Sequence, residues 1–272
     1  MGTGHSLRGR VALVTGVSRR QGIGFAVASR LAAAGASLFL THHRPHDEKQ
    51  PWGADDLDTV LEAVRDRCVD ERQLVRALPV DLAAPTAADE TMRSAVDALG
   101  HVDILVCNHA RSGDDGPLGT LTAEMLDAHW AVNTRSSLLL VQAFAAQHDG
   151  RPGGRVVLMT SGQGLGPMVD EVAYAASKAA LAGITLTLAE HLADAGITVN
   201  TVNPGPVDTG YMTPELSARL APMFPFGRMG RPDDPARLIA WLVSDEGAWM
   251  TGQVLNSEGG FARWRPASRP DG

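Results

Sequence analysis

Short apolar runs alternate with helical segments along most of the chain, and this alternation constrains the fold more than any other feature. Strands are predicted at 10–15, 36–41, 74–80, 102–107, 155–159, 197–202 and 253–256. Helices are predicted at 23–34, 57–69, 86–99, 122–148 and 172–194. Strands that are apolar throughout and separated by helices indicate a parallel sheet covered on both faces. We therefore expect an α/β fold with a doubly wound parallel sheet of about seven strands.

No linker-like stretch interrupts this alternation, so we expect a single domain at 9–262. A flexible N-terminal tail is expected at 1–8 and a C-terminal tail at 263–272. The connection 42–56 contains Pro45, Pro51 and Gly53 and is predicted to be a loop.

Charge and cysteine content argue against several classes of protein. The formal net charge is −7 and no basic stripe is interleaved with aromatic residues, so nucleic acid is not expected as a partner. Cys68 and Cys107 are too few for a disulfide framework, and neither they nor His42, His43 and His46 have metal-ligand spacing. No apolar stretch approaches the roughly 20 residues that span a bilayer, and the N-terminus lacks the apolar core of a signal peptide. We expect a soluble, cytoplasmic protein without a metal site.

Polar residues gather where the predicted strands end. In parallel sheets of this kind, ligands bind beyond the carboxyl ends of the strands. The residues at or just after those ends are Thr15, Thr41, Asp81, Asn108, Ser161 and Asn203. The sequence therefore predicts a single binding edge.

A glycine-rich loop, Thr15–Gly24, joins the first strand to the first helix. Its glycines at 16, 22 and 24 allow the backbone to approach a pyrophosphate, and the following helix N-terminus offers free N–H groups. An ordinary strand-to-helix turn is the alternative, but the order strand, glycine loop, helix favours a dinucleotide site.

Tyr174 and Lys178 are four residues apart on a predicted helix, so their side chains share one face. An ammonium beside a phenol favours the phenolate, which would let the pair move a proton near neutral pH. Taken alone, such a pair is also typical of a half-buried ring beside a solvated amine. Ser161 lies thirteen residues before the tyrosine, at the end of a predicted buried strand.

Together these residues resemble the classical short-chain dehydrogenase/reductase family, in particular members similar to 3-oxoacyl-ACP reductases. The resemblance runs from about Gly9 to Gly260. It implies a Rossmann-type dinucleotide-binding catalytic domain and a catalytic set of Asn133, Ser161, Tyr174 and Lys178. In the family, the Tyr gives a proton to a carbonyl oxygen and the Ser donates a second hydrogen bond. The Lys lowers the Tyr pKa and binds the nicotinamide ribose, and the Asn holds a water molecule.

The resemblance also implies a nicotinamide cofactor. NAD-preferring relatives carry an acidic residue at the end of the second strand, where this chain has His42, His43 and Arg44. Since Arg19 and Arg20 add positive charge and arginine suits a phosphate, NADP(H) is expected; a solvated charged loop is the alternative. The expected cofactor contacts are Gly16, Ser18, Arg19, Arg20, Gly22, Ile23, Gly24, His42, His43, Arg44, Asp81, Leu82, Asn108, Ala110, Tyr174, Lys178, Pro204, Gly205, Val207 and Thr209.

The chain departs from the family pattern in two places. Five residues separate Gly16 from Gly22 where the family has three, which places a two-residue insertion around Arg19–Gln21. His109 and Arg111 replace an asparagine and a glycine in the family's Asn-Asn-Ala-Gly segment. Arg111 would place a cation near the pocket.

The expected function is NADPH-dependent transfer of hydride between the cofactor and a small carbonyl or secondary alcohol. A 3-oxoacyl thioester or a secondary-metabolite ketone is the expected substrate. Alternatives are a non-catalytic NADP-binding regulatory protein on the same fold and an epimerase or dehydratase, which the chain length disfavours. Residues 211–231 form either an apolar lid or an amphipathic helix packed on the core. The resemblance implies a homo-oligomer, a dimer or tetramer.

Overall fold

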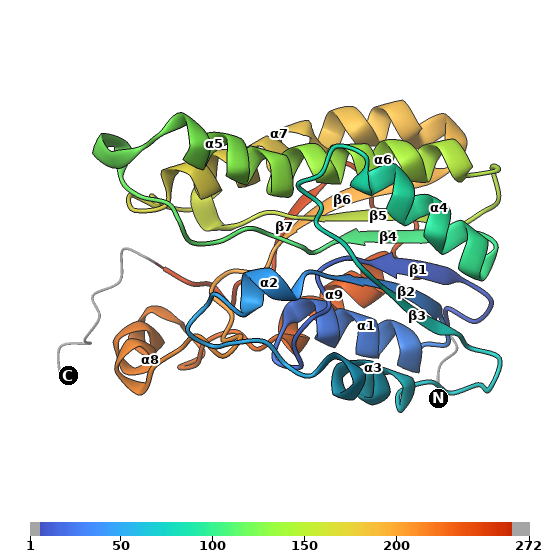
Figure 1. Ribbon diagram of the computed structural model, residues 1–272, viewed down its shortest axis with the longest axis horizontal. Helices are drawn as coiled ribbons and strands as arrows, with labels where there is room; N and C mark the ends of the chain where they lie inside the picture. Colours follow the sequence, from blue (N-terminus) through green and yellow to red (C-terminus); the bar gives the residue numbers. More distant parts are fainter. Residues whose placement is uncertain (1–5, 263–272) are drawn as a thin grey trace.

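A parallel sheet forms the centre of the protein in the computed structural model, which describes residues 6–262 (Figure 1). Its seven strands have the order β3-β2-β1-β4-β5-β6-β7, and every neighbouring pair is parallel. The strands are β1 Val11–Val14, β2 Ser37–His42, β3 Val75–Pro79, β4 Ile104–Cys107, β5 Gly154–Met159, β6 Ile197–Asn203 and β7 Val254–Asn256. The predicted seven-stranded, doubly wound α/β fold is confirmed.

Helices cover both faces of the sheet (Figure 1). One layer contains α4 Ala87–Leu99, α5 Ala123–His129, α6 Ser136–Gln147 and α7 Val172–Leu192. The other contains α1 Ile23–Ala33, α3 Leu57–Arg65 and α9 Asp233–Leu242. Two short helices, α2 Arg44–Asp47 and α8 Pro214–Leu220, lie outside these layers, and 3₁₀ turns occur at Leu118–Thr120, Gly162–Gly164, Ala193–Ala195 and Ala221–Met223.

Successive residues of a strand enter different cores, which explains the continuous apolar runs in the sequence. Leu13 of β1 packs in the core beneath α4, α6 and α7. Ala12 and Val14 pack in the core formed with α1, α3 and α9. Because side chains alternate across a strand, a central strand of a sheet covered on both faces buries successive residues and is mainly apolar.

The strand order reverses between β1 and β4, so the segments that follow these strands lie against each other. Asn108, just after β4, donates from Nδ2 to the carbonyl oxygens of Thr15 and Gly16 at 3.0 and 3.1 Å. A crevice at such a switch point is the usual ligand site of this architecture. The glycine loop and the loop after β4 therefore form its two walls.

The predicted helix at 122–148 is instead three segments. Between α5 and α6 the chain forms a π-helical segment, Trp130–Arg135, with Asn133 inside it. π-Helical turns inside a longer helix occur frequently at functional sites. The predicted loop 42–56 contains the one-turn helix α2, in which Pro45 takes a first-turn position that proline tolerates.

The first described residues belong to the packed domain. Leu7 is 1% exposed, and its N–H donates to the Ala34 carbonyl oxygen at 2.8 Å. Residues 1–5 of the predicted N-terminal tail, and the predicted tail at 263–272, lie outside the described residues.

The expectation that no apolar stretch is long enough to span a bilayer is wrong for α7. Together with its 3₁₀ extension, Val172–Ala195 has 24 residues and a mean hydropathy of 1.4 in its most apolar window, enough by length and composition. In this fold the helix packs against β5, β6 and α5. A helix that buries one face on a sheet can be as apolar as a membrane span, so composition alone does not distinguish the two.

Candidate functional site

A cavity of about 630 Å³ lies beyond the carboxyl ends of the central strands and brings together most of the predicted cofactor contacts. The predicted residues that line it are Gly16, Ser18, Arg19, Gly22, Ile23, Gly24, His42, His43, Asp81, Leu82, Asn108, Ala110 and Thr209. They come from the segments after β1, β2, β3 and β4 and from the segment that follows β6. Segments distant in the sequence thus form one surface.

The glycine loop leaves no space for side chains at two positions. A Cβ atom on Gly24 would lie 2.4 Å from the Gly16 carbonyl oxygen, and one on Gly16, whose φ is +73°, would lie 2.8 Å from the His109 Cα. The helix α1 begins here with Gly22 as its N-cap, without a side-chain capping bond and without an acidic residue in its first turn. Backbone N–H groups at this helix end suit the diphosphate of a dinucleotide, so the residues present fit such a cofactor.

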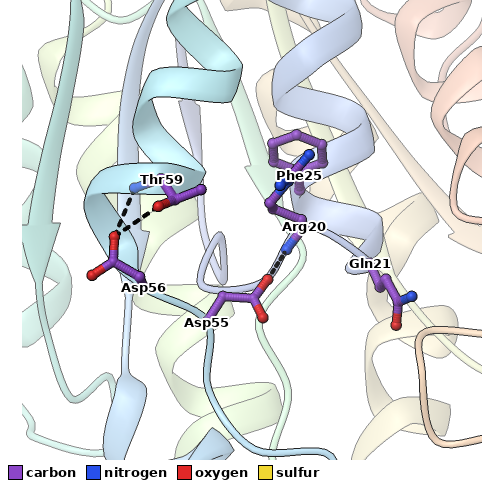
Figure 2. Close-up of a pocket in the computed structure, with 6 residues that line it drawn as sticks. All are labelled: Arg20, Gln21, Phe25, Asp55, Asp56 and Thr59. Atoms are coloured by element: carbon purple, nitrogen blue, oxygen red, sulfur yellow. Dashed lines mark hydrogen bonds between the residues drawn. The ribbon is translucent and has the colours of Figure 1, made fainter.

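Arg20 and Arg44 do not line the cavity, contrary to the prediction. Arg20 is exposed, and its backbone N–H donates to Asp55 Oδ2 at 2.7 Å. It borders a second cavity of about 480 Å³ between α1 and α3, which is shown in Figure 2. Arg44 forms an ion pair with Glu48, with 3.3 Å between Nη2 and Oε1. Arg20, in the two-residue insertion of the glycine loop, therefore faces away from the cavity.

Arg19 turns across the crevice. Its guanidinium donates to the Thr209 carbonyl oxygen and lies 5.3 Å above the ring of Trp52. Burial lowers the pKa of Arg19, while the carboxylates of Asp47 and Asp55 act in the opposite direction. Arg19 thereby connects the glycine loop, the segment after β2 and the segment after β6.

The end of β2 and the residues after it bring both basic side chains and a carboxylate to the cavity. Burial is the largest cause of a lowered pKa of His42, and the charges of Arg44 and His43 act in the same direction, so this imidazole is neutral at neutral pH. Asp47 is buried, lines the cavity and accepts a hydrogen bond from Ser18 Oγ at 2.5 Å. The first carboxylate after the second strand therefore lies in the pocket, which the sequence did not reveal.

Ser161, Tyr174 and Lys178 meet beyond the end of β5, although none of them is among the residues that line the cavity. Lys178 is buried, its Nζ donates to the Met159 carbonyl oxygen at 2.9 Å, and Nζ lies 5.8 Å from the centre of the Tyr174 ring. Hydrogen bonds link the set to the cavity, because Asn133 binds both Arg111, a lining residue, and Ser177, which donates to the Tyr174 carbonyl oxygen.

The predicted lowering of the Tyr174 pKa by Lys178 is wrong for this structure. Burial raises the pKa of Tyr174 to about 12, and its hydrogen bond with Ser161 only partly opposes this effect. Burial also lowers the pKa of Lys178 to about 8. Removal of both groups from water outweighs the influence of an ammonium that is directed at a backbone carbonyl.

Asn133 fixes the backbone at Arg111. Its Oδ1 accepts from the Arg111 N–H at 2.7 Å, and its Nδ2 donates to the Arg111 carbonyl oxygen at 3.2 Å and to Ser177 Oγ at 2.9 Å. Ser177 Oγ in turn donates to the Tyr174 carbonyl oxygen at 2.7 Å. Asn133 therefore links the loop after β4 to the helix that carries Tyr174.

Of the four cofactor contacts predicted after β6, only one lies in the cavity. Thr209 lines the cavity, whereas Pro204, Gly205 and Val207 do not. Val207 is buried and forms an isolated parallel bridge with Gly230. The Val207–Gly230 bridge therefore lies in the same segment as Thr209, two residues before it.

Residues 211–231 do not form the predicted amphipathic helix packed on the core, and the apolar lid stays a prediction. The helix α8 has no buried residue, and Phe226 is 81% exposed. Phe224 and Met229 are buried, and the Phe224 ring lies 4.9 Å from that of Phe261. The segment is thus anchored at two residues and exposed in between.

Sequence reasoning missed the cavity residues contributed by the connection after β2 and by the loop after β4. These are Pro45, His46, Asp47, Lys49, Gln50, Trp52, His109, Ser112, Gly113 and Asp114. Arg111, which was expected to place a cation near the pocket, also lines the cavity. The departure from the family pattern at His109 was the only signal for any of the missed residues. The connection after β2 has no periodic pattern that could indicate which side chains face a ligand.

Comparison with known proteins agrees with this geometry. A family profile described as Enoyl-(Acyl carrier protein) reductase matches residues 16–262. The uncharacterized oxidoreductase YjdA of Bacillus subtilis is 42% identical over 256 residues, covering 93% of this chain and 97% of that protein. A chloroplastic NADPH-dependent aldehyde reductase-like protein of Arabidopsis thaliana is 34% identical and covers 94% of this chain and 95% of that protein.

A solved structure of a short-chain dehydrogenase/reductase from Serratia marcescens is 34% identical, with a TM-score of 0.81 over 95% of this chain and 100% of that chain. The finer resemblance to 3-oxoacyl-ACP reductases has only loose support, because these relatives carry other descriptions. Since the profile and the relatives match nearly the whole chain, this protein belongs to the short-chain dehydrogenase/reductase family of oxidoreductases.

Proposed function

We propose that this protein is an NADPH-dependent reductase that interconverts a small carbonyl compound and the corresponding secondary alcohol. The observation that carries the proposal is the convergence of Ser161, Tyr174 and Lys178 beside a cavity lined by the glycine loop. When bound, the nicotinamide supplies the hydride that reduces the carbonyl carbon.

Tyr174 is the proton donor in the direction of reduction. With its pKa raised to about 12, the phenol keeps its proton at neutral pH and can donate it to the substrate oxygen. Ser161, already hydrogen-bonded to Tyr174, donates a second hydrogen bond to the same oxygen. Preorganised donors directed at a developing negative charge are the main source of electrostatic catalysis.

Lys178 returns a proton to Tyr174 after each reduction. Its pKa of about 8 lies close to neutral pH, so both protonation states are accessible during turnover. Asn133 keeps the loop after β4 in place, and it is proposed to support a water molecule that relays protons from solvent to Lys178. The buried ammonium, bonded to the Met159 carbonyl oxygen, is oriented by the end of β5.

Two observations support NADPH as the preferred cofactor. Arg19, Lys49 and Arg111 place three cationic side chains along the cavity, and cations favour a nucleotide that carries an additional phosphate. The Arabidopsis relative is described as NADPH-dependent. Three carboxylates, of Asp47, Asp81 and Asp114, also line the cavity and act against this preference. The Asp114 carboxylate forms an ion pair with Arg111 at 2.7 Å, and the Asp47 carboxylate accepts a hydrogen bond from Ser18.

The substrate is proposed to be a ketone of secondary metabolism or a 3-oxoacyl thioester, bound between 162–171 and 211–231. In the second segment the exposed Tyr211 lies beside the cavity-lining Trp52, with 6.1 Å between the ring centres, and Phe226 is also exposed. We further propose a cytoplasmic homo-oligomer, a dimer or tetramer, which mass measurements over a range of dilutions would test. Only monomer at all concentrations would contradict that part.

The test is oxidation of NADPH, with NADH in parallel, against a panel of ketones, aldehydes and 3-oxoacyl thioesters. Turnover of one class with NADPH, at a higher kcat/KM than with NADH, is the expected result. Equal use of both cofactors would contradict the NADPH preference. Tight binding of NADPH without turnover of any compound would instead favour a non-catalytic regulatory protein on the same fold.

A further inference from the structure

The loop after β4 caps the helix that carries the proposed catalytic tyrosine. The first N–H groups of a helix have no partner within the helix itself. In α7, the Val172 N–H donates to the Gly116 carbonyl oxygen at 3.3 Å. The Ala173 and Tyr174 N–H groups donate to Asp115 Oδ1 and Oδ2 at 3.0 and 2.7 Å. Two adjacent loop residues thus satisfy the first three donors of α7.

The helix does not supply this cap from its own sequence. Glu171 occupies the N-cap position without a side-chain capping bond, and the first turn of α7 contains no acidic residue. Asp115 lies 58 and 59 residues before the two N–H groups that it binds. A carboxylate at a helix N-terminus is stabilised both by direct hydrogen bonds and by the helix dipole.

The Asp115 carboxylate is itself held firmly. Its side chain is 5% exposed, and Oδ1 also accepts from the Gly116 N–H at 2.7 Å. Burial raises the pKa of Asp115, but the hydrogen bonds from Tyr174, Gly116 and Ala173 together lower it below its usual value. The carboxylate therefore stays ionised at neutral pH.

His129 forms the wall behind this contact. Its side chain is fully buried, Nδ1 lies 2.9 Å from the Met125 carbonyl oxygen, and Nε2 lies 4.0 Å from Asp115 Oδ2. The imidazole meets the Tyr174 ring edge-on, with 6.4 Å between the ring centres. The ring of Tyr174 is thus bounded by His129 while its backbone is bound by Asp115.

We propose that Asp115 is a positioning residue for Tyr174: it fixes the first turn of α7, and His129 fixes the ring that this turn presents to the substrate. The inference rests on the proposed function, because it holds that this contact places the Tyr174 hydroxyl for catalysis. The same loop carries Arg111, which lines the cavity, so one segment contacts both the cofactor cavity and the catalytic helix.

The test is the isosteric variant Asp115→Asn. An amide has one acceptor oxygen, so its NH₂ group must face at least one of the N–H donors that the carboxylate now binds. Asp127→Asn, an identical change on the exposed side of α5, is the matched control. We expect kcat to fall about tenfold or more with unchanged NADPH affinity, because small displacements of a catalytic group are costly. Asp127→Asn should match the wild type.

Hydrogen exchange of the amides of residues 172–174 gives a readout that does not depend on turnover. Faster exchange in Asp115→Asn than in Asp127→Asn is expected. Unchanged exchange would overturn the proposed anchor even if the wild-type protein reduced no carbonyl compound, which separates this inference from the proposed function. A lower melting temperature with normal kcat would also overturn it, since the cap would then only stabilise the fold.

If Asp115→Asn does not fold, Asp115→Ser serves instead, because serine is a good capping residue that keeps one acceptor. An intermediate kcat, below that of the wild type, is then expected. Wild-type kcat in this variant would contradict the proposal.

Discussion

The Nδ1 atom of His109 lies 2.6 Å from the Oγ1 atom of Thr15, a contact that joins the loop after β4 to the end of β1. On the other side of the ring, Nε2 lies 2.7 Å from Ser136 Oγ and 3.0 Å from the Val132 carbonyl oxygen. Ser136 Oγ donates to that same carbonyl, so it accepts from Nε2–H. Burial lowers the pKa of His109 to about 3, so the imidazole is neutral and Nδ1 carries no hydrogen. Thr15 Oγ1, which also lies 3.3 Å from the Val106 carbonyl oxygen, then donates to Nδ1.

This neutral histidine predicts a specific dependence of stability on pH. Burial and the charge of Lys178 lower the pKa of His109 to about 3. Between pH 6.5 and 3 the unfolded chain binds a proton here that the folded protein does not, so stability falls as the pH decreases through this range. The full shift corresponds to roughly 5 kcal/mol at most.

His109→Asn, which introduces the residue typical of the family, should flatten the pH dependence of the free energy of unfolding over that range. His191→Asn, at an exposed position near the end of α7, is the control and should leave the slope unchanged. Denaturant unfolding at several pH values measures both. Equal slopes in wild type and His109→Asn would contradict the assignment.

Removal of the Asp47 charge is expected to shift the cofactor preference further toward NADPH. Its buried carboxylate lines the cavity and would repel the additional phosphate of NADPH. Asp47→Asn can still accept from Ser18 Oγ, so we expect tighter binding of NADPH with little change for NADH. Titration calorimetry with both nucleotides measures the ratio. Glu48→Gln, one residue away and exposed, removes the same charge and should change the ratio less.

Removal of the Trp52 ring is expected to lower the affinity for the cofactor, because this ring contacts Arg19. The Arg19 guanidinium lies over the Trp52 ring, and the Tyr211 ring lies 6.1 Å from that of Trp52. Since a cation over an aromatic ring is worth about 0.5–2 kcal/mol, Trp52→Ala should weaken NADPH binding by roughly twofold to thirtyfold. Trp52→Phe should retain part of the affinity. Trp249→Ala, at a residue 98% exposed, is the control, and equal affinities in all variants would exclude a role for Trp52.

The chain has two tyrosines, which allows a direct test of the proton donor. Tyr174→Phe should lower kcat by about 10²-fold or more while NADPH still binds, because a positioned general acid contributes that much. Tyr211→Phe should retain measurable turnover. Steady-state rates and nucleotide binding measured on the same preparations decide the matter. A kcat of Tyr174→Phe within a few-fold of the wild type would eliminate Tyr174 as the donor.

The sequence predicted those parts of the fold that depend on local pattern. The apolar runs identified the central strands because a sheet covered on both faces buries both sides of each strand, as Ala12, Leu13 and Val14 illustrate. The glycine loop could be recognised because only glycine fits where Gly24 meets Gly16. The break at Trp130–Arg135 was not predictable, since it accompanies the contact of Asn133 with Arg111, 22 residues away.

By itself, the sequence determined the parallel sheet and the position of the binding edge, because these follow from periodicity and from polar residues at strand ends such as Thr41, Asp81 and Asn108, which line the cavity. Apart from the loop glycines, the other predicted contacts that line it came from the resemblance to the family. Only the tertiary structure decided that Arg20 faces outward, that Asp47 enters the cavity and that Asp115 holds Tyr174. Each depends on how segments far apart in the chain meet across the sheet. Burial of Tyr174 and Lys178 likewise set their pKa values, and burial is a property of the folded protein that no spacing of residues expresses.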